Sequence, residues 1–93
     1  MDRTAFEAGL REKGYGEVVD RQMQPREVNP THAHEFDARL LVLDGVVTSA
    51  VDGSERTYRA GETYEMPAGR RHSETAGPEG ARYLAGRRYQ SGI

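Results

Sequence analysis

From Glu17 onward, short stretches of alternating apolar and polar residues follow one another along the chain. Such alternation is typical of β-strands, because successive side chains on a strand point to opposite faces. The pattern predicts strands at residues 17–24, 39–43, 46–51, 56–58, 63–66, 72–76 and 82–88. Turn signals separate them at Asp44-Gly45, Asp52-Gly53, Ala60-Gly61, Pro67-Ala68-Gly69 and Gly77-Pro78-Glu79-Gly80. Turns at such short intervals, with no second helical period, indicate an antiparallel sandwich or barrel.

The residues before Glu17 carry a different pattern. Thr4 and Glu7 have the spacing of a capping box, in which a hydroxyl and a carboxylate satisfy free amides at a helix start. Phe6 and Leu10 share one helix face at positions i and i+4. Gly14 is a helix stop signal. The sequence therefore predicts one short helix, at roughly residues 4–13, ahead of the strands.

Composition limits the size of the core. The chain has 93 residues, of which 35% are hydrophobic, and it contains 11 glycines. Such a length predicts a single domain that buries about 60 to 65% of its unfolded surface. We therefore expect one domain over residues 1–93, with the helix and a lead-in at 1–16 and a β-barrel at 17–89. Because this core is small, a homodimer is the expected assembly.

Charge and hydropathy argue against several classes of partner. The formal net charge is −2, and acidic and basic residues are interspersed. This distribution lacks the basic surface that nucleic acids or anionic lipids require. The longest aliphatic run, Leu40–Leu43, is far too short to span a membrane, and there is no cysteine to form a disulfide or a thiolate ligand. We expect a soluble cytoplasmic protein that binds neither nucleic acid nor a membrane.

The chain has three histidines, and their positions suit one metal site. His32 and His34 are two residues apart, so on an extended strand they point to the same face with α-carbons about 6 to 7 Å apart. His72 follows a Pro-x-Gly turn and can approach from a neighbouring strand. Imidazole is a common ligand for transition metals at neutral pH. The alternative is that all three are ordinary polar residues, solvated or hydrogen-bonded within the sheet.

The segment from Thr31 to Ala76 resembles the cupin family, in which two short motifs surround a metal inside a double-stranded β-helix, or jelly-roll, barrel. Its second motif is matched at every interval by Gly61, Pro67, Gly69 and His72. Its first motif is matched at His32, His34 and Gly45. The resemblance implies an all-β jelly-roll barrel behind a short N-terminal helix. It also implies that His32, His34 and His72 hold one divalent transition metal per chain.

The first motif also departs from the family pattern. Ala38 occupies the position of the family's glutamate ligand and cannot bind a metal. Asp37, one residue earlier, is a possible fourth ligand if a bulge turns it inward. The alternative for Asp37 is an exposed or turn-capping acid. Without it, the site is a three-histidine face with exchangeable positions.

A three-histidine site on this fold resembles that of non-haem iron dioxygenases. The first function hypothesis is accordingly a metal-dependent dioxygenase or related oxygenase that acts on a small anionic substrate. The second is a non-catalytic module or sensor that binds a metal or a small ligand. The same imidazoles suit iron, nickel, zinc, manganese and copper, so the sequence does not identify the metal. Three neutral ligands leave the ion's charge uncompensated, which favours an anionic small molecule in the open positions.

Other side chains are candidates for the pocket around this site. Tyr64 and Met66 alternate with Glu65, so both are expected to face the barrel interior. Tyr64 is either a core residue or a catalytic group whose hydroxyl donates a hydrogen bond or a proton to the ligand. An apolar wall is expected from Phe36, Leu41 and Leu43. A substrate carboxylate could be bound by Arg39 or Arg70-Arg71, unless these are simply solvated.

Overall fold

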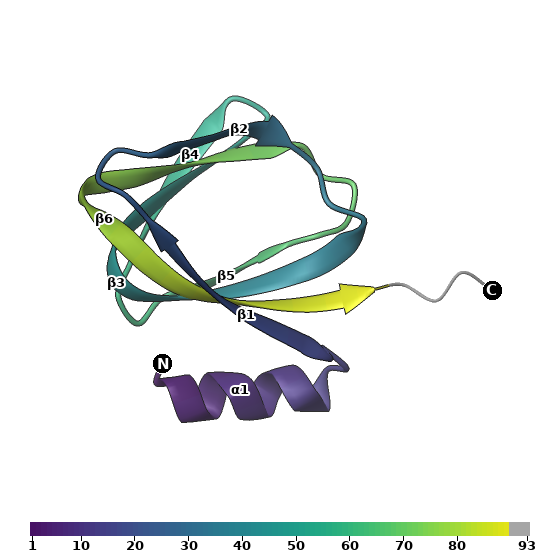
Figure 1. Cartoon of the computed structure of the whole chain (residues 1–93). Helices are drawn as coiled ribbons and strands as arrows, with labels where there is room; N and C mark the ends of the chain where they lie inside the picture. Colours follow the sequence, from purple (N-terminus) through teal and green to yellow (C-terminus); the bar gives the residue numbers. More distant parts are fainter. Residues whose placement is uncertain (90–93) are drawn as a thin grey trace.

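A computed structural model describes residues 1–89, and residues 90–93 of the predicted domain lie outside the described part. One helix and six strands make up this part, and the strands curve around a central space (Figure 1). Their bounds are α1 Arg3–Glu12, β1 Glu17–Met23, β2 Val28–His32, β3 Phe36–Val51, β4 Ser54–Arg59, β5 Thr63–Met66 and β6 His72–Tyr89. The predicted all-β jelly-roll class with a short N-terminal helix is confirmed. None of the helices in the described residues has the length and apolar character needed to cross a membrane.

Two long strands, β3 and β6, organise the sheet. They pair antiparallel with each other from Phe36–Tyr89 to Ala50–Ser73. Each also pairs with two shorter strands, one after the other: β3 with β5 and then β4, and β6 with β2 and then β1. The pair β3–β6 therefore joins the four shorter strands into one sheet.

The predicted breaks in these strands at Asp44-Gly45 and at residues 77–80 were wrong, because the chain does not reverse there. Between the pairs Gly45–Ala81 and Val47–Ala76, residues 77–80 of β6 lie opposite Val46 of β3. The register also shifts between Val42 and Asp44. Extra residues on one strand bend it and increase its twist. The glycines therefore bend continuous strands at the point where β6 stops pairing with β2 and begins to pair with β1.

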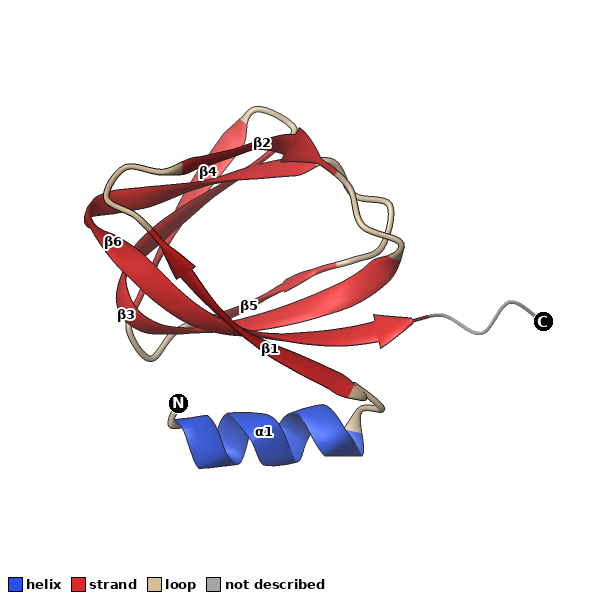
Figure 2. Cartoon of the chain, in the orientation of Figure 1, coloured by secondary structure: helices blue, strands red, loops and turns tan. Residues whose placement is uncertain are grey.

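Helix α1 covers the outside of the barrel (Figure 2). Phe6 and Leu10 are buried there against Leu41 and Leu84. A side-chain carbon on Gly86 would lie 2.7 Å from Leu10, so glycine permits this close approach. The helix ends before Gly14, which has a φ of 81°, as the sequence predicted.

The predicted capping box at the start of α1 was wrong. The N-cap is Asp2, whose carboxylate accepts a hydrogen bond of 2.8 Å from the amide of Ala5. Glu7 instead lies 3.4 Å from the guanidinium of Arg3 within the helix. Aspartate caps a helix as well as threonine does. With Asp2 as the cap, the helix begins at Arg3, one residue before the predicted start.

The aliphatic run at residues 40–43 serves both faces of β3. Leu40 packs inside the barrel with Ala38, Tyr64, Met66 and Ala85. Leu41 points the other way and packs against the helix, with Leu43 beside it. The prediction that Leu41 and Leu43 belong to the apolar wall of the pocket was therefore wrong. Alternate residues of a strand point to opposite faces, and these two lie on the helix side.

Replacing Gly45 by alanine should destabilise the protein far more than the same change at Gly53. Both glycines have a positive φ, of 74° and 80°, which costs an alanine about 1 to 2 kcal/mol. At Gly45 the new methyl group would also overlap the carbonyl oxygen of Gly80, whereas at Gly53 it meets nothing within 4 Å. We expect a loss above about 3 kcal/mol for Gly45→Ala, measured by urea unfolding. Equal losses for the two variants would contradict this account of the bend.

Candidate metal centre

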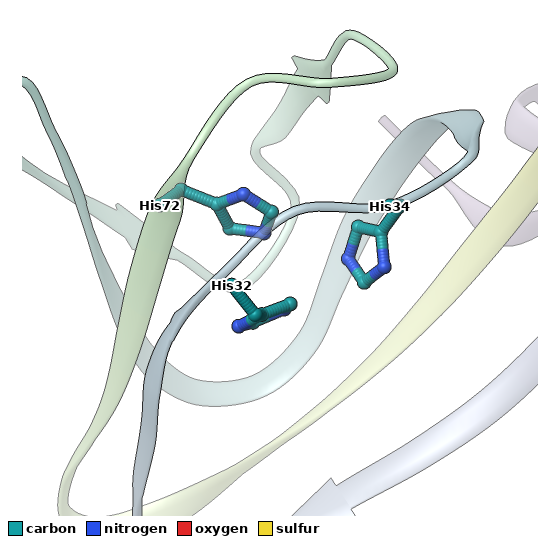
Figure 3. Close-up of side chains that lie close together, drawn as sticks. All are labelled: His32, His34 and His72. Atoms are coloured by element: carbon teal, nitrogen blue, oxygen red, sulfur yellow. The ribbon is translucent and has the colours of Figure 1, made fainter.

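The three histidine side chains meet at one end of the barrel interior. His32 is the last residue of β2, His34 lies in the connection to β3, and His72 is the first residue of β6. One ring nitrogen from each lies within 4.8 Å of the others. The ring centroids are 4.4 to 5.1 Å apart, and the rings gather around a shared space (Figure 3).

Strand pairing and a loop contact bring these residues together. His32 and His72 are directly paired across β2 and β6. His34 lies beyond the end of β2, so the prediction of one strand carrying both His32 and His34 was wrong. The carbonyl of His34 accepts a hydrogen bond of 2.9 Å from the amide of Gly69 in the Pro-x-Gly turn. This turn therefore holds the His34 loop beside the start of β6.

Two of the imidazoles are held in the same tautomer. The Nδ1 atom of His32 lies 2.7 Å from the carbonyl of Pro30, and that of His72 lies 2.9 Å from the carbonyl of Arg70. A carbonyl oxygen can only accept a hydrogen bond, so Nδ1 carries the proton in each neutral ring. The lone pair is then on Nε2. Such a carbonyl contact orients many metal-binding histidines.

The third imidazole is also suited to bind a metal as a neutral ligand. Burial lowers the pKa of His34, and the positive charges that His32 and His72 can carry lower that pKa further. Its ring stacks on Phe36 with centroids 4.5 Å apart. The neutral form of His34 is therefore favoured at neutral pH, and its lone pair is available.

A buried acid beside the histidines was missed by the sequence analysis. The side chain of Glu74 is 8% exposed, and its Oε2 atom lies 3.4 Å from Nε2 of His72. Its Oε1 atom accepts a hydrogen bond of 3.2 Å from the side-chain amide of Asn29. Glu74 follows His72 by two residues on β6, so both point into the barrel. That spacing was the available signal, and it places a negative charge next to a cation held by the histidines.

The histidines line a cavity of about 560 Å³. Its apolar wall contains Phe36, Ala38, Leu40 and Met66. Ala38 therefore presents a methyl group to the cavity at the position of the family's glutamate. Polar residues that line the same cavity include Asn29, Glu74, Tyr83 and Arg87. Burial and the charge of Glu74 raise the pKa of Tyr83, so its hydroxyl stays protonated.

Asp37 engages other partners than the histidines. Its Oδ1 atom accepts a hydrogen bond of 2.9 Å from the amide of Ala68, and its Oδ2 atom lies 3.1 Å from the guanidinium of Arg88. It is not among the residues that line the cavity, whereas its neighbour Ala38 is. The alternation of β3 explains this difference. The carboxylate links the Pro-x-Gly turn to β6.

Tyr64 lies in the barrel core, packed behind residues that line the histidine cavity. It is 8% exposed, its ring stacks on Tyr58 with centroids 4.2 Å apart, and it does not line that cavity. Its hydroxyl is buried without a hydrogen-bond partner in the described part of the chain. Burial is the main cause that raises the pKa of this hydroxyl. These features fit the core role of Tyr64 better than the catalytic one.

The arginines that the sequence suggested as anion ligands do not line the histidine cavity. Arg39 forms an ion pair with Glu65. Arg70 and Arg71 are not among the residues that line the cavity. Arg87 does line it, and nothing in the local sequence distinguishes this arginine from its neighbour Arg88.

A barrel with a cluster of histidines in its interior is the arrangement that the sequence resemblance implied. A comparison with family models supports that resemblance. Residues 19–85 match the family model described as the cupin domain. The chain therefore belongs to the cupin family. A comparison with curated protein sequences finds no match.

Solved structures share the fold. A cupin-2 domain containing protein from Shewanella frigidimarina is 25% identical, with a TM-score of 0.61, over 73% of this chain and 63% of that chain. A conserved protein of unknown function from Streptococcus pyogenes is 19% identical, with a TM-score of 0.68, over 81% and 76%. KdgF from Halomonas sp. is 22% identical, with a TM-score of 0.65, over 78% and 69%. The chain thus spans less than two thirds of the Shewanella protein.

Replacing Asp37 by asparagine should reduce stability and leave metal content unchanged. The variant loses the charge that attracts Arg88, and the amide is a weaker acceptor for Ala68, at a cost of about 1 to 2 kcal/mol. Urea unfolding and elemental analysis of the same preparations measure the two effects. The matched control is Asp20→Asn, which removes an exposed ion pair with Arg82 and should change stability less. Loss of metal from Asp37→Asn would instead make this acid a ligand.

Proposed function

We propose that this cupin binds one divalent transition metal through His32, His34 and His72. The observation that carries the proposal is the convergence of the three rings, whose ligand atoms lie within 4.8 Å of one another. In the neutral form of two of them, a carbonyl contact also places the lone pair on Nε2. Iron, nickel, zinc, manganese and copper all suit three imidazoles. When bound, the metal supplies a Lewis acid with positions open to a small molecule.

The proposed ligand of the cavity is a small, anionic molecule. Three neutral imidazoles leave the charge of the ion uncompensated, and Glu74 offsets only part of it. A volume of about 560 Å³ falls within the range of small-molecule sites. His32 and His34 are only partly buried, so solvent and ligand have a path to the site.

We further propose that the reaction class is metal-dependent oxygenation of this small molecule. The open access to three neutral ligands supports this reaction, because substrate and oxygen must both reach the site. The competing function is non-catalytic binding or sensing, which the same ligand set also allows. A cytoplasmic location and a homodimer stay predictions from the sequence.

Protein purified without added metal should contain close to one ion per chain. Replacing His72 by alanine removes one of three ligands and leaves the other two unable to hold the ion, so the metal should be lost. Elemental analysis with calibrated protein concentration measures both. His34→Ala, in a loop, is the second variant, because it tests the site without disturbing a strand. Wild-type protein that takes up no metal, even after incubation with each of the five ions, would refute the site.

Iron-loaded protein should consume oxygen with one member of a panel of thiols, diketones and hydroxyaromatic acids. An oxygen electrode measures the rate, and His34→Ala protein treated in the same way is the control for free iron. Equal rates with the variant would assign the consumption to unbound metal. No consumption with any compound, from protein that retains its iron, would favour the binding module over the oxygenase.

A further inference from the structure

Arg87 is an incompletely paired cation on the wall of the metal cavity. It belongs to β6, and its side chain is only 21% exposed. The Nε atom is buried and has no hydrogen-bond partner among the described residues. One terminal nitrogen lies 3.6 Å from the carboxylate of Glu17, beyond hydrogen-bond distance. The Nε donor of this partly buried guanidinium is therefore unsatisfied within the described residues.

The position of Arg87 connects it to the histidines through one aromatic ring. Its Cζ atom lies 4.7 Å from the centroid of the Phe36 ring, and the same ring stacks on His34. Arg87 and His34 both line this cavity. An anion bound to this guanidinium would therefore lie within the same cavity as the histidines. Arg21 lines the cavity too, but it is exposed to solvent.

The opposite sign of charge marks the His72 side of the cavity. Glu74 is buried there, and its carboxylate accepts a hydrogen bond from the side-chain amide of Asn29. In the metal-free protein, a second anionic group near this carboxylate would be repelled across a medium of low dielectric. A neutral group that donates hydrogen bonds would be accepted, because Oε2 has lone pairs to offer. The cavity is therefore polarised, with a cation on the His34 side and an acid on the His72 side.

We propose that Arg87 anchors the carboxylate of a small monocarboxylate, and that Glu74 selects a neutral, hydrogen-bond-donating group at the other end of this ligand. The inference rests on the proposed function for the identity of the cavity as a ligand site. A guanidinium matches a carboxylate in both charge and planar geometry, whereas an ammonium matches it in charge alone. In the metal-free protein, the buried acid discriminates against dicarboxylates.

Succinamate and succinate are suitable probes, because they differ only in whether the second end is an amide or a carboxylate. Isothermal titration of wild-type protein, both metal-free and zinc-loaded, measures their affinities. We expect metal-free protein to bind succinamate about 10-fold more tightly than succinate. Zinc-loaded protein should show a smaller preference, because the cation offsets the charge of Glu74. Replacing Arg87 by glutamine should weaken binding of both by about 10- to 100-fold. Glu74→Gln should abolish the preference for succinamate.

The matched control is Arg82→Gln, which changes net charge equally on the same strand but removes an exposed ion pair with Asp20 outside the cavity. It should leave both affinities unchanged. Arg87→Lys keeps the positive charge but lacks Nε, so it should bind succinamate more weakly than wild type. This variant tests the anchor if Arg87→Gln does not fold. Three results would overturn the inference. They are wild-type affinity in both Arg87 variants, a preference of the metal-free protein for succinate, and no binding of either probe at millimolar concentration.

Metal content of the same samples separates this inference from the proposed function. Arg87→Gln should retain the metal content of the wild type while losing affinity for the carboxylate. Absence of metal in all samples, with an Arg87-dependent affinity for succinamate, would refute the metal site and leave the anchor standing. Normal metal content with an affinity that ignores Arg87 would refute the anchor alone.

Discussion

The antiparallel pairing of β2 with β6 is the constraint on which the site depends. It sets His32 opposite His72 and Asn29 opposite Glu74, with a register shift between Asn29 and His32. His72 and Glu74 share one face of β6, and the shift lets Asn29 and His32 both reach the same cavity. A slip of one residue would turn either strand's set of side chains out of the barrel, because the side-chain period of a strand is two. The hydrogen bond between Gly69 and His34 then adds the third ring from a loop. The metal centre is thus a consequence of register.

That register is carried by the long strands rather than by the short ones. β6 pairs with β3 over most of its length, and the bend at residues 77–80 lets a single strand serve β1 at one end and β2 at the other. Gly45 and Gly80 lie in contact at this bend, where neither has room for a side-chain carbon. In a chain with 35% hydrophobic residues, this continuity lets a small core position a polar cavity. Helix α1 contributes by covering the outer face of the same two strands.

The electrostatics of the cavity follow from which polar groups are buried together. Neutral imidazoles carry no charge to balance a cation, and the methyl group of Ala38 adds none. Glu74 supplies one negative charge beside His72, and Arg87 supplies a positive charge near His34. A charge in such surroundings persists only where another charge or dipole stabilises it. The arrangement therefore favours a ligand whose two ends differ in charge.

Local pattern by itself determined the barrel class, the helix and its end at Gly14, most strand positions and the three histidines, because alternation, turn residues and motif spacing are properties of neighbouring residues. It could not determine that Leu41 faces the helix while Leu40 faces the interior, since an unbroken apolar run has no preferred face. Arg87 likewise gave no local sign of sharing a cavity with the histidines and Glu74. Strands β2, β3 and β6 bring them there, and the pairing of strands distant in sequence is decided only when the whole chain closes around its core.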